Sequence, residues 1–276
     1  MAWTEITRRQ YDRRSLRYAS DSTDAEWNVI APFFVAQESK VGRPLEHDPR
    51  TLWDAMQYIA ATGCQWAQLP KDFPPFTTVQ YHFYRLRDNG LLDLINEALV
   101  VVARVIEGRH AEPTAGVIDS QSVKTTEAGG PRGFDAGKKI KGRKRHIVTD
   151  TAGNMLSTIV HEANIQDRDG APGTIASAMQ GFPTLVKLFA DGAYAGDKLE
   201  KALAPAGPIL EIVKRPEGAK GFVVIARRWV VERTFAWLNR CRRLAKDWEA
   251  PIASSEAWIF ISSIRRMTRR IARTEF

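Results

Sequence analysis

The chain lacks the features that mark several common classes of protein. It contains two cysteines, Cys64 and Cys241, which lie far apart and form no CxxC pair. That pattern argues against a disulfide framework and against a zinc finger. The longest apolar stretch, residues 91–106, is interrupted by charged and polar side chains, so no uninterrupted apolar run is long enough for a membrane span. The N-terminus also lacks the apolar core of a signal peptide, and we therefore expect a soluble, cytoplasmic protein.

The motifs of several enzyme classes are missing as well. A phosphate-binding loop ending at Gly137-Lys138 would need glycine and a hydroxyl residue where the chain has Arg132 and Lys139. His161-Glu162 is not followed by the second histidine of a zinc protease motif, and the five histidines of the chain do not cluster. No Gly-x-Ser-x-Gly elbow occurs. These absences disfavour a nucleotide-binding loop at that position, a zinc protease and a serine hydrolase.

Positive charge, in contrast, is abundant. The 276 residues include 40 lysines and arginines against 32 acidic residues, which gives a net charge of +8 and a pI near 9.6. A basic chain of this size usually has a polyanionic partner, most often nucleic acid and less often an anionic membrane. On charge alone, a basic protein without such a partner remains an alternative.

The N-terminal part divides into a basic arm, residues 1–20, and a mainly helical domain, residues 21–110. Arginines interleaved with aromatic residues in the arm suit contacts with DNA phosphates and sugars, although a solvated, disordered tail fits equally well. In the helical domain, Ser22 or Thr23 and Asp48-Pro49 are typical helix starts, and Gly63 is a typical end. A basic, aromatic helix over residues 77–89 favours a helix-turn-helix reader of DNA; a plain helical bundle is the alternative. The DNA-contact candidates in these two regions are Arg13, Arg14, Arg17, Gln80 and Arg85.

The pattern changes after a linker at residues 111–116. We expect strands at residues 117–119, 146–150, 155–161, 186–191 and 209–213, and helices at 169–179, 226–244 and 255–273. This order predicts an α/β fold, with a mixed five-stranded sheet flanked by helices, over residues 111–276. We interpret Asp150, Asp167 and Asp169 as turn and helix-capping residues.

Three carboxylates stand out in this region. Asp119 and Asp191 each end an apolar strand, where an unpaired carboxylate is costly unless it meets a metal ion or a charged partner. Glu232 follows on a helix, on the face opposite its apolar stripe. Arg228 and Glu232 could instead form a surface ion pair at i and i+4. Because carboxylates are the ligands that Mg²⁺ prefers, the trio predicts a divalent-metal site for phosphodiester chemistry.

The densest positive run lies at residues 138–145, after a glycine-rich loop. A charge run is usually a solvated face, but this one precedes a strand beside the expected site, and we predict that it contacts DNA phosphates. The DNA-contact candidates of the C-terminal region are Lys124, Lys138, Lys139, Lys141, Arg143, Lys144, Arg145, Arg228 and Arg240.

Long motifs resemble one known family. They include VIDSQSVKTTEAGGPRGFDAGKKIKGRKRHIVTDTAG, ADGAYAG and RRWVVERTFAWLNRCRRLAKDWE, together with SLRYASDSTDAEW and TGCQWAQLPKDFPPFTTV nearer the start. The chain resembles the DDE transposases of bacterial insertion sequences, in the group named after insertion sequence five. In the glutamate signature of related families, Arg228 and Glu232 match. Ile225 replaces the tyrosine, and Asn239, followed by Arg240, replaces the lysine.

The resemblance implies an RNase H-like catalytic domain in which Asp119, Asp191 and Glu232 are both the catalytic residues and the metal ligands. It also implies two Mg²⁺ ions per active site, with Mn²⁺ as a substitute. The expected activity is binding to terminal inverted repeats, cleavage there, and transfer of 3′-hydroxyl ends to target DNA. The expected partner is double-stranded DNA, bound by a homodimer or higher oligomer in the bacterial cytoplasm, at the nucleoid. Two alternatives are a domesticated, non-catalytic DNA-binding regulator and a host nuclease or resolvase of the same fold.

Overall fold

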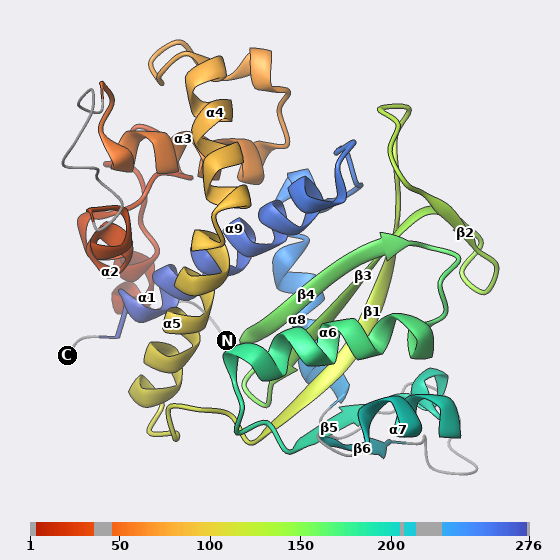
Figure 1. The fold of residues 1–276 in the computed structure, drawn as a ribbon. Coiled ribbons are helices and arrows are strands. Elements are labelled where there is room, and N and C mark those ends of the chain that lie inside the picture. Colours follow the sequence, from red (N-terminus) through yellow and green to blue (C-terminus); the bar gives the residue numbers. More distant parts are fainter. Residues whose placement is uncertain (1–3, 36–45, 205–206, 214–227, 275–276) are drawn as a thin grey trace.

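A computed structural model of the chain describes residues 4–35, 46–204, 207–213 and 228–274. The N-terminal part is helical, as the sequence predicts (Figure 1). Its helices are α1 (Glu5–Gln10), α2 (Asp24–Val35), α3 (Pro49–Thr62), α4 (Phe76–Asp88) and α5 (Leu91–Ile106), with a 3-10 turn, η1 (Trp66–Gln68), before α4.

The helix ends in this part follow from local hydrogen bonds. Thr23 and Glu26 form a reciprocal capping box, in which each side chain accepts from the backbone N–H of the other, at the start of α2. Asp48 caps α3 by accepting from the backbone N–H of Thr51, and Gly63 ends that helix with φ of 73°. The helix starts and the stop predicted here from the sequence are confirmed.

A mixed sheet follows. Its strands are β1 (Ala115–Lys124), β2 (Gly133–Asp135), β3 (Ile140–Asp150), β4 (Met155–Glu162), β5 (Lys187–Ala190) and β6 (Ile209–Ile212). The order is β2-β3-β1-β5-β6, and β4 pairs with β3 beside β2. β3 is antiparallel to β1, whereas β5 is parallel to β1. The five predicted strands are present. β1 and β3 are longer than predicted, and the short strand β2 was not expected.

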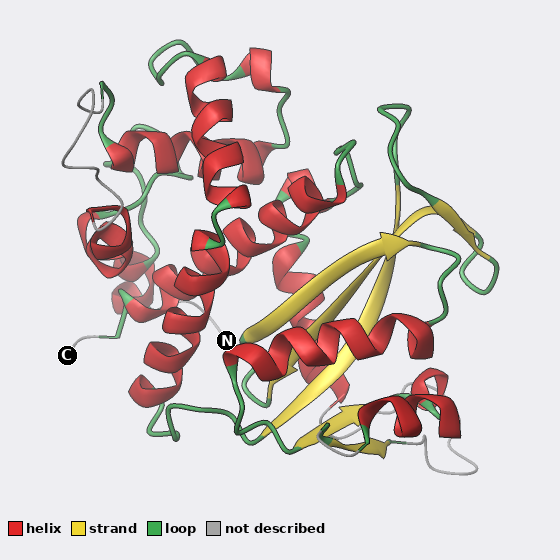
Figure 2. Ribbon diagram, in the orientation of Figure 1, coloured by secondary structure: helices red, strands yellow, loops and turns green. Residues whose placement is uncertain are grey.

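Helices cover both faces of the sheet (Figure 2). α6 (Asp167–Gly181) packs on β3 and β4 on one side, and α8 (Arg228–Leu238) packs on β1 and β3 on the other. α7 (Asp197–Leu203) follows β5 after the 3-10 turn η2 (Gly192–Tyr194). The predicted helix over 226–244 begins outside the described residues and ends earlier, at Leu238; a 3-10 turn, η3 (Arg242–Leu244), follows it.

The last helix, α9 (Ile252–Ile271), connects the two parts of the molecule. It packs against α2, α3 and α5 as well as against β4. Trp258 of α9 stacks on Phe83 of α4, with ring centroids 4.5 Å apart, and lies beside Trp66. The N-terminal helices and the sheet therefore share one apolar core. The division of the chain at residue 110 remains a prediction.

Within the described residues, no helix has both the length and the apolar character needed to span a membrane.

A buried aspartate in α3 makes the stability of the fold depend on pH. Burial raises the pKa of Asp54 from 3.8 to about 6, although the hydrogen bonds from Ser22 oppose this shift. The stability that neutral Asp54 contributes is therefore complete below about pH 4 and is lost as the pH rises through 6. Asparagine stays neutral at every pH. The free energy of unfolding of Asp54→Asn should therefore rise by about 3 kcal/mol relative to that of wild type as the pH increases from 4 to above 6. Urea unfolding of both proteins from pH 4 to 7 tests this; parallel stability curves would contradict it.

Candidate active site

The register of two parallel strands brings Asp119 and Asp191 together. Val117 of β1 is the partner of Phe189 in β5, and this is the last pair between these strands. Asp119 and Asp191 each lie two residues beyond that pair. Because parallel strands advance by the same distance per residue, the two aspartates reach the same level of the sheet. The structure therefore places two carboxylates from distant parts of the sequence side by side.

Each aspartate is held by a backbone N–H of its own segment. Asp119 Oδ1 accepts from the N–H of Ser120 at 2.7 Å. Asp191 follows the end of β5 and caps the turn η2, with its Oδ1 accepting from the N–H of Ala193 at 2.8 Å. These bonds orient both carboxylates, and they leave further oxygen lone pairs available to a ligand.

Arg228 links Glu232 to the aspartates. Its Nη2 lies 3.4 Å from Oδ2 of Asp191 and 3.5 Å from Oε1 of Glu232. The i, i+4 ion pair of Arg228 with Glu232 therefore exists, but its second partner comes from the end of β5, and the guanidinium is only 22% exposed. α8 packs across β1, so the glutamate lies on the same side of the sheet as this cluster. Arg228 thus joins Glu232 to Asp191, and Asp191 lies beside Asp119.

The electrostatics of the site favour an additional cation. Burial, and secondarily the negative charge of Asp191, raise the pKa of Asp119 to about 6, although Ser120, Arg228 and Lys138 oppose the shift. Burial and the nearby aspartates also raise the pKa of the Tyr194 hydroxyl. In both cases burial is the larger cause, and the neighbouring carboxylates add to it.

A second polar cluster supports β1 from the opposite face. Ser120 Oγ donates to Oδ1 of Asp167 at 2.7 Å, and Lys144 Nζ lies 2.9 Å from the same oxygen. Burial alone would raise the pKa of Asp167, but hydrogen bonds from His146, Lys144 and Ser120 lower it well below its usual range. Asp167 starts α6 and thereby anchors that helix to β1 and β3. Asp167 therefore does more than cap a helix, which is the role predicted from the sequence. Its partners Ser120, Lys144 and His146 are distant from it in the sequence, so the sequence alone does not reveal these contacts.

The donor chemistry of the site suits a hard divalent ion. In the described part of the chain, no three or more His, Cys, Asp or Glu side chains are already gathered closely enough to hold a metal ion. Arg228 occupies the space between Asp191 and Glu232, and the glutamate is 54% exposed. Carboxylate oxygens and an excess of negative charge are nevertheless what Mg²⁺ requires. Asp119, Asp191 and Glu232 are the residues that would hold such an ion.

Comparison with known proteins agrees with this geometry. Residues 110–265 match the family described as "Transposase DDE domain". The chain belongs to the DDE transposases. Residues 23–96 match the family described as "Putative transposase of IS4/5 family", so the chain is a transposase of the IS4/5 type. The resemblance seen in the sequence is thereby confirmed, and with it the RNase H-like fold.

A relative supports the same assignment over part of its length. The transposase is similar to the "Putative transposase for insertion sequence element IS402" of Burkholderia cepacia, with 34% identity over 110 residues. The alignment covers 37% of this chain and 52% of the relative. The chain thus spans about half the length of the curated relative that it matches.

The basic run of the transposase does not form the predicted DNA surface. Arg143, Lys144 and Arg145 lie in β3, with exposures of 0%, 5% and 3%, and the prediction that they contact DNA is wrong. Strand β3 is covered on both faces, and each side chain has partners within the protein. Arg143 pairs with Asp247 at 3.1 Å, Lys144 pairs with Asp167, and Arg145 donates to the carbonyl of Leu244 at 2.8 Å.

The flanking basic residues of the transposase do lie at the surface. Lys124, Lys139, Lys141 and Arg240 are exposed. Lys138 is also exposed and donates to the carbonyl of Ser120 at 3.3 Å, beside Asp119. Their role in binding DNA stays a prediction.

The arginines of the N-terminal arm differ from one another. Arg13 pairs with Glu26 and donates to the carbonyl of Asp21 at 2.7 Å, and its role as a DNA contact stays a prediction. Arg17 lies over the ring of Phe73 at 4.0 Å and donates to the Asp72 carbonyl. Both arginines attach residues 13–17 to the helices, which a solvated tail would not do.

Three candidates in the N-terminal part remain accessible. Arg14 is exposed and pairs with Asp12 at 2.6 Å. On α4, Gln80 donates to the hydroxyl of Tyr84 at 3.0 Å, and exposed Arg85 lies near the ring of Tyr81. The polar, aromatic face of α4 is therefore available to a partner, as a recognition helix requires.

Proposed function

We propose that this chain binds the terminal inverted repeats of an insertion sequence, cleaves the DNA there, and joins the resulting 3′-hydroxyl ends to target DNA. The observation that carries the proposal is the placement of Asp119 beside Asp191, with Arg228 joining Asp191 to Glu232. DDE transposase domains generally use divalent metal ions. Asp119, Asp191 and Glu232 would hold two Mg²⁺ ions, with Mn²⁺ as a substitute. When bound, such ions stabilise charge on the attacking and leaving oxygens of a phosphodiester displacement.

The other residues of the site would prepare it for DNA. With a pKa of about 6, Asp119 is mainly ionised at neutral pH and is ready to act as a ligand. Arg228 holds Asp191 and Glu232 in place before DNA arrives and carries a guanidinium suited to phosphate oxygens. Lys138, beside Asp119, offers a second positive charge for the same phosphate.

Recognition of DNA would belong to the N-terminal part. The helical domain at residues 21–110 would recognise the ends of the element through the exposed face of α4. Residues 111–276 would carry out catalysis. Residues 1–20 add Arg14 as an accessible contact. Because two ends must be held together before they are joined, we expect a homodimer or higher oligomer on double-stranded DNA. The bacterial cytoplasm, at the nucleoid, is the corresponding location.

The test uses a duplex carrying the inverted repeats that flank the gene, bracketed by a short direct duplication of target DNA. The full chain with MgCl₂ should nick this duplex at the repeat ends, yield 3′-hydroxyls, and join them to a second duplex. EDTA should abolish both products, and MnCl₂ should restore them. Binding without cleavage in either metal would instead identify a DNA-binding regulator. Cleavage of branched DNA without need for the repeats, and without joining, would identify a host nuclease.

A further inference from the structure

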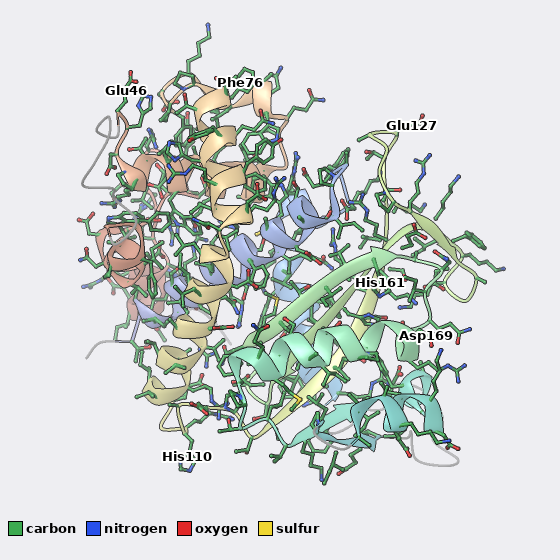
Figure 3. All side chains as sticks on the ribbon, in the orientation of Figure 1. Glu46, Phe76, His110, Glu127, His161 and Asp169 are labelled. Carbon is green, nitrogen blue, oxygen red and sulfur yellow. The ribbon has the colours of Figure 1, made fainter. Side chains whose placement is uncertain are left out.

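A basic groove lies at the end of the sheet beyond the carboxylates. It has a volume of about 580 Å³ and is formed where β1, β2 and β3 meet the segment after η3. Its lining includes Lys124, Arg132, Lys139, Lys141 and Lys246, together with Phe134. Figure 3 shows Glu127 at the tip of the loop between β1 and β2, which projects beyond the sheet above this region.

The basic side chains of the groove form no ion pairs with the described part of the chain. Among the described residues, no carboxylate lies within ion-pair distance of these five basic side chains. Glu127 is the acidic residue of the lining. Arg143 and Lys144, by contrast, lie on the adjoining part of β3 and are both paired with aspartates. A concave surface with several unpaired cations concentrates positive potential and attracts a polyanion.

An exposed aromatic ring lies among these cations. Phe134 of β2 is 55% exposed and is the sheet partner of Lys141. Lys246 lies over the ring of Trp248, which is 41% exposed. Surfaces that combine cations with accessible aromatic faces are typical of proteins that bind single-stranded nucleic acid, because bases stack on the rings while lysines contact phosphates.

Buried contacts fix the walls of the groove. Arg143 donates to the carbonyls of Pro131 (2.9 Å) and Ala250 (2.6 Å) and pairs with Asp247. The N–H of Asp247 in turn donates to the Lys124 carbonyl at 2.8 Å. Gly142 is required where β1 and β3 approach, because a Cβ there would lie 2.0 Å from the carbonyl oxygen of Val123. The groove is therefore a defined part of the fold.

The groove lies further along β1 than the candidate active site. Lys124 is five residues beyond Asp119 on the same strand, which corresponds to about 17 Å, or a few nucleotides of an extended strand. Lys138 lies beside Asp119 and precedes the groove residue Lys139. A volume of this size accommodates a ligand as large as one or two nucleotides but not a duplex.

We propose that this groove binds an unpaired DNA strand a few nucleotides from the reacting phosphate, with a base stacked on Phe134 and phosphates on the lysines. The inference rests on the proposed function, since it assigns the groove to the DNA on which the carboxylates act. It predicts that the DNA is locally opened beside the cleavage position. Unstacked bases are needed because the face of a base is not accessible inside a duplex.

The experiment measures binding separately from cleavage. The full chain with Asp119→Asn, in EDTA, is titrated with a fluorescein-labelled 12-nucleotide single strand and with the matching duplex, and anisotropy is recorded. Phe134→Ala should weaken binding of the single strand about tenfold and leave duplex binding unchanged, and Phe134→Tyr should restore it. Lys141→Ala should lower the slope of log affinity against log salt by about 0.7, whereas Lys201→Ala, on the exposed face of α7, should not.

Each outcome decides a separate point. Wild-type affinity of both Phe134→Ala and Lys141→Ala for the single strand overturns the proposal. Equal weakening of single strand and duplex by Phe134→Ala overturns the preference for unpaired DNA. If the binding effects appear but wild-type protein fails to cleave repeat-bearing DNA in Mg²⁺ or Mn²⁺, the groove assignment stands and the proposed catalytic function fails.

Discussion

Asp191→Asn should abolish cleavage of repeat-bearing DNA, with a rate at least about a thousandfold below that of wild type. Loss of residues that merely support metal ligands typically costs 10- to 100-fold, and loss of a ligand itself should cost more. The substitution keeps the shape of the side chain and an oxygen that can accept from the N–H of Ala193, so the turn η2 should survive. What it removes is the charge beside Asp119 and Arg228.

The matched control is Asp197→Asn, which makes the same chemical change at an exposed position in the first turn of α7. Its cleavage rate should be within about twofold of wild type. Both variants should bind the duplex with wild-type affinity, because binding is assigned to other residues. Cleavage is measured by gel analysis of single-turnover reactions in MgCl₂. Persistent cleavage by Asp191→Asn would remove this residue from the catalytic site.

Arg143→Met should lower the free energy of unfolding by about 3–5 kcal/mol. Removing one member of a buried ion pair leaves the other charge uncompensated in the interior. Arg143 and Asp247 have side-chain exposures of 0% and 1%, and Arg143 also bonds to two carbonyls and to Ser255. This one side chain therefore joins β3 to the loop before β2 and to the start of α9.

Urea unfolding measures this effect, and two further variants define its origin. Arg242→Met, at an exposed position in η3, should change stability by about 0.5 kcal/mol or less. Arg143→Met combined with Asp247→Asn should be less destabilised than the sum of the single variants, because no buried charge is left unpaired. A loss below about 1 kcal/mol for Arg143→Met would show that the pair is not needed for the fold.

The carboxylates could be identified from the sequence because their signal is local. Asp119 and Asp191 each follow a short apolar run, and each was therefore expected at the end of a strand. Asp191 does follow the end of β5, whereas Asp119 lies within β1, paired with Ile147, so that part of the prediction is wrong. The helix that carries Glu232 was recognisable from its apolar stripe, although its actual end at Leu238 was not. The i, i+4 spacing predicts Arg228 as a partner of Glu232, but it does not reveal that Arg228 reaches Asp191 as well.

The basic run is buried, although its sequence predicts a surface, because charge density does not reveal burial. Alternate residues of β3 point to opposite faces, with Arg143 and Arg145 toward the α8 and α9 side and Lys144 and His146 toward α6. Both faces are covered, and the partners that neutralise the charges, Asp247 among them, are distant in the sequence. Strand β3 begins at Ile140, earlier than the strand predicted at residues 146–150. Its early residues pair with β1, and the sequence alone does not reveal this pairing.

The position of α9 also bears on how the protein is made. Helices α2, α3 and α5 leave the ribosome long before α9, against which they pack, has been synthesised. Until then, the apolar surfaces around Phe83 and Trp66 lack Trp258 and are exposed to chaperones or to aggregation. A prematurely terminated product ending before Ile252 would carry every residue of the helical region and yet lack the helix that completes its core.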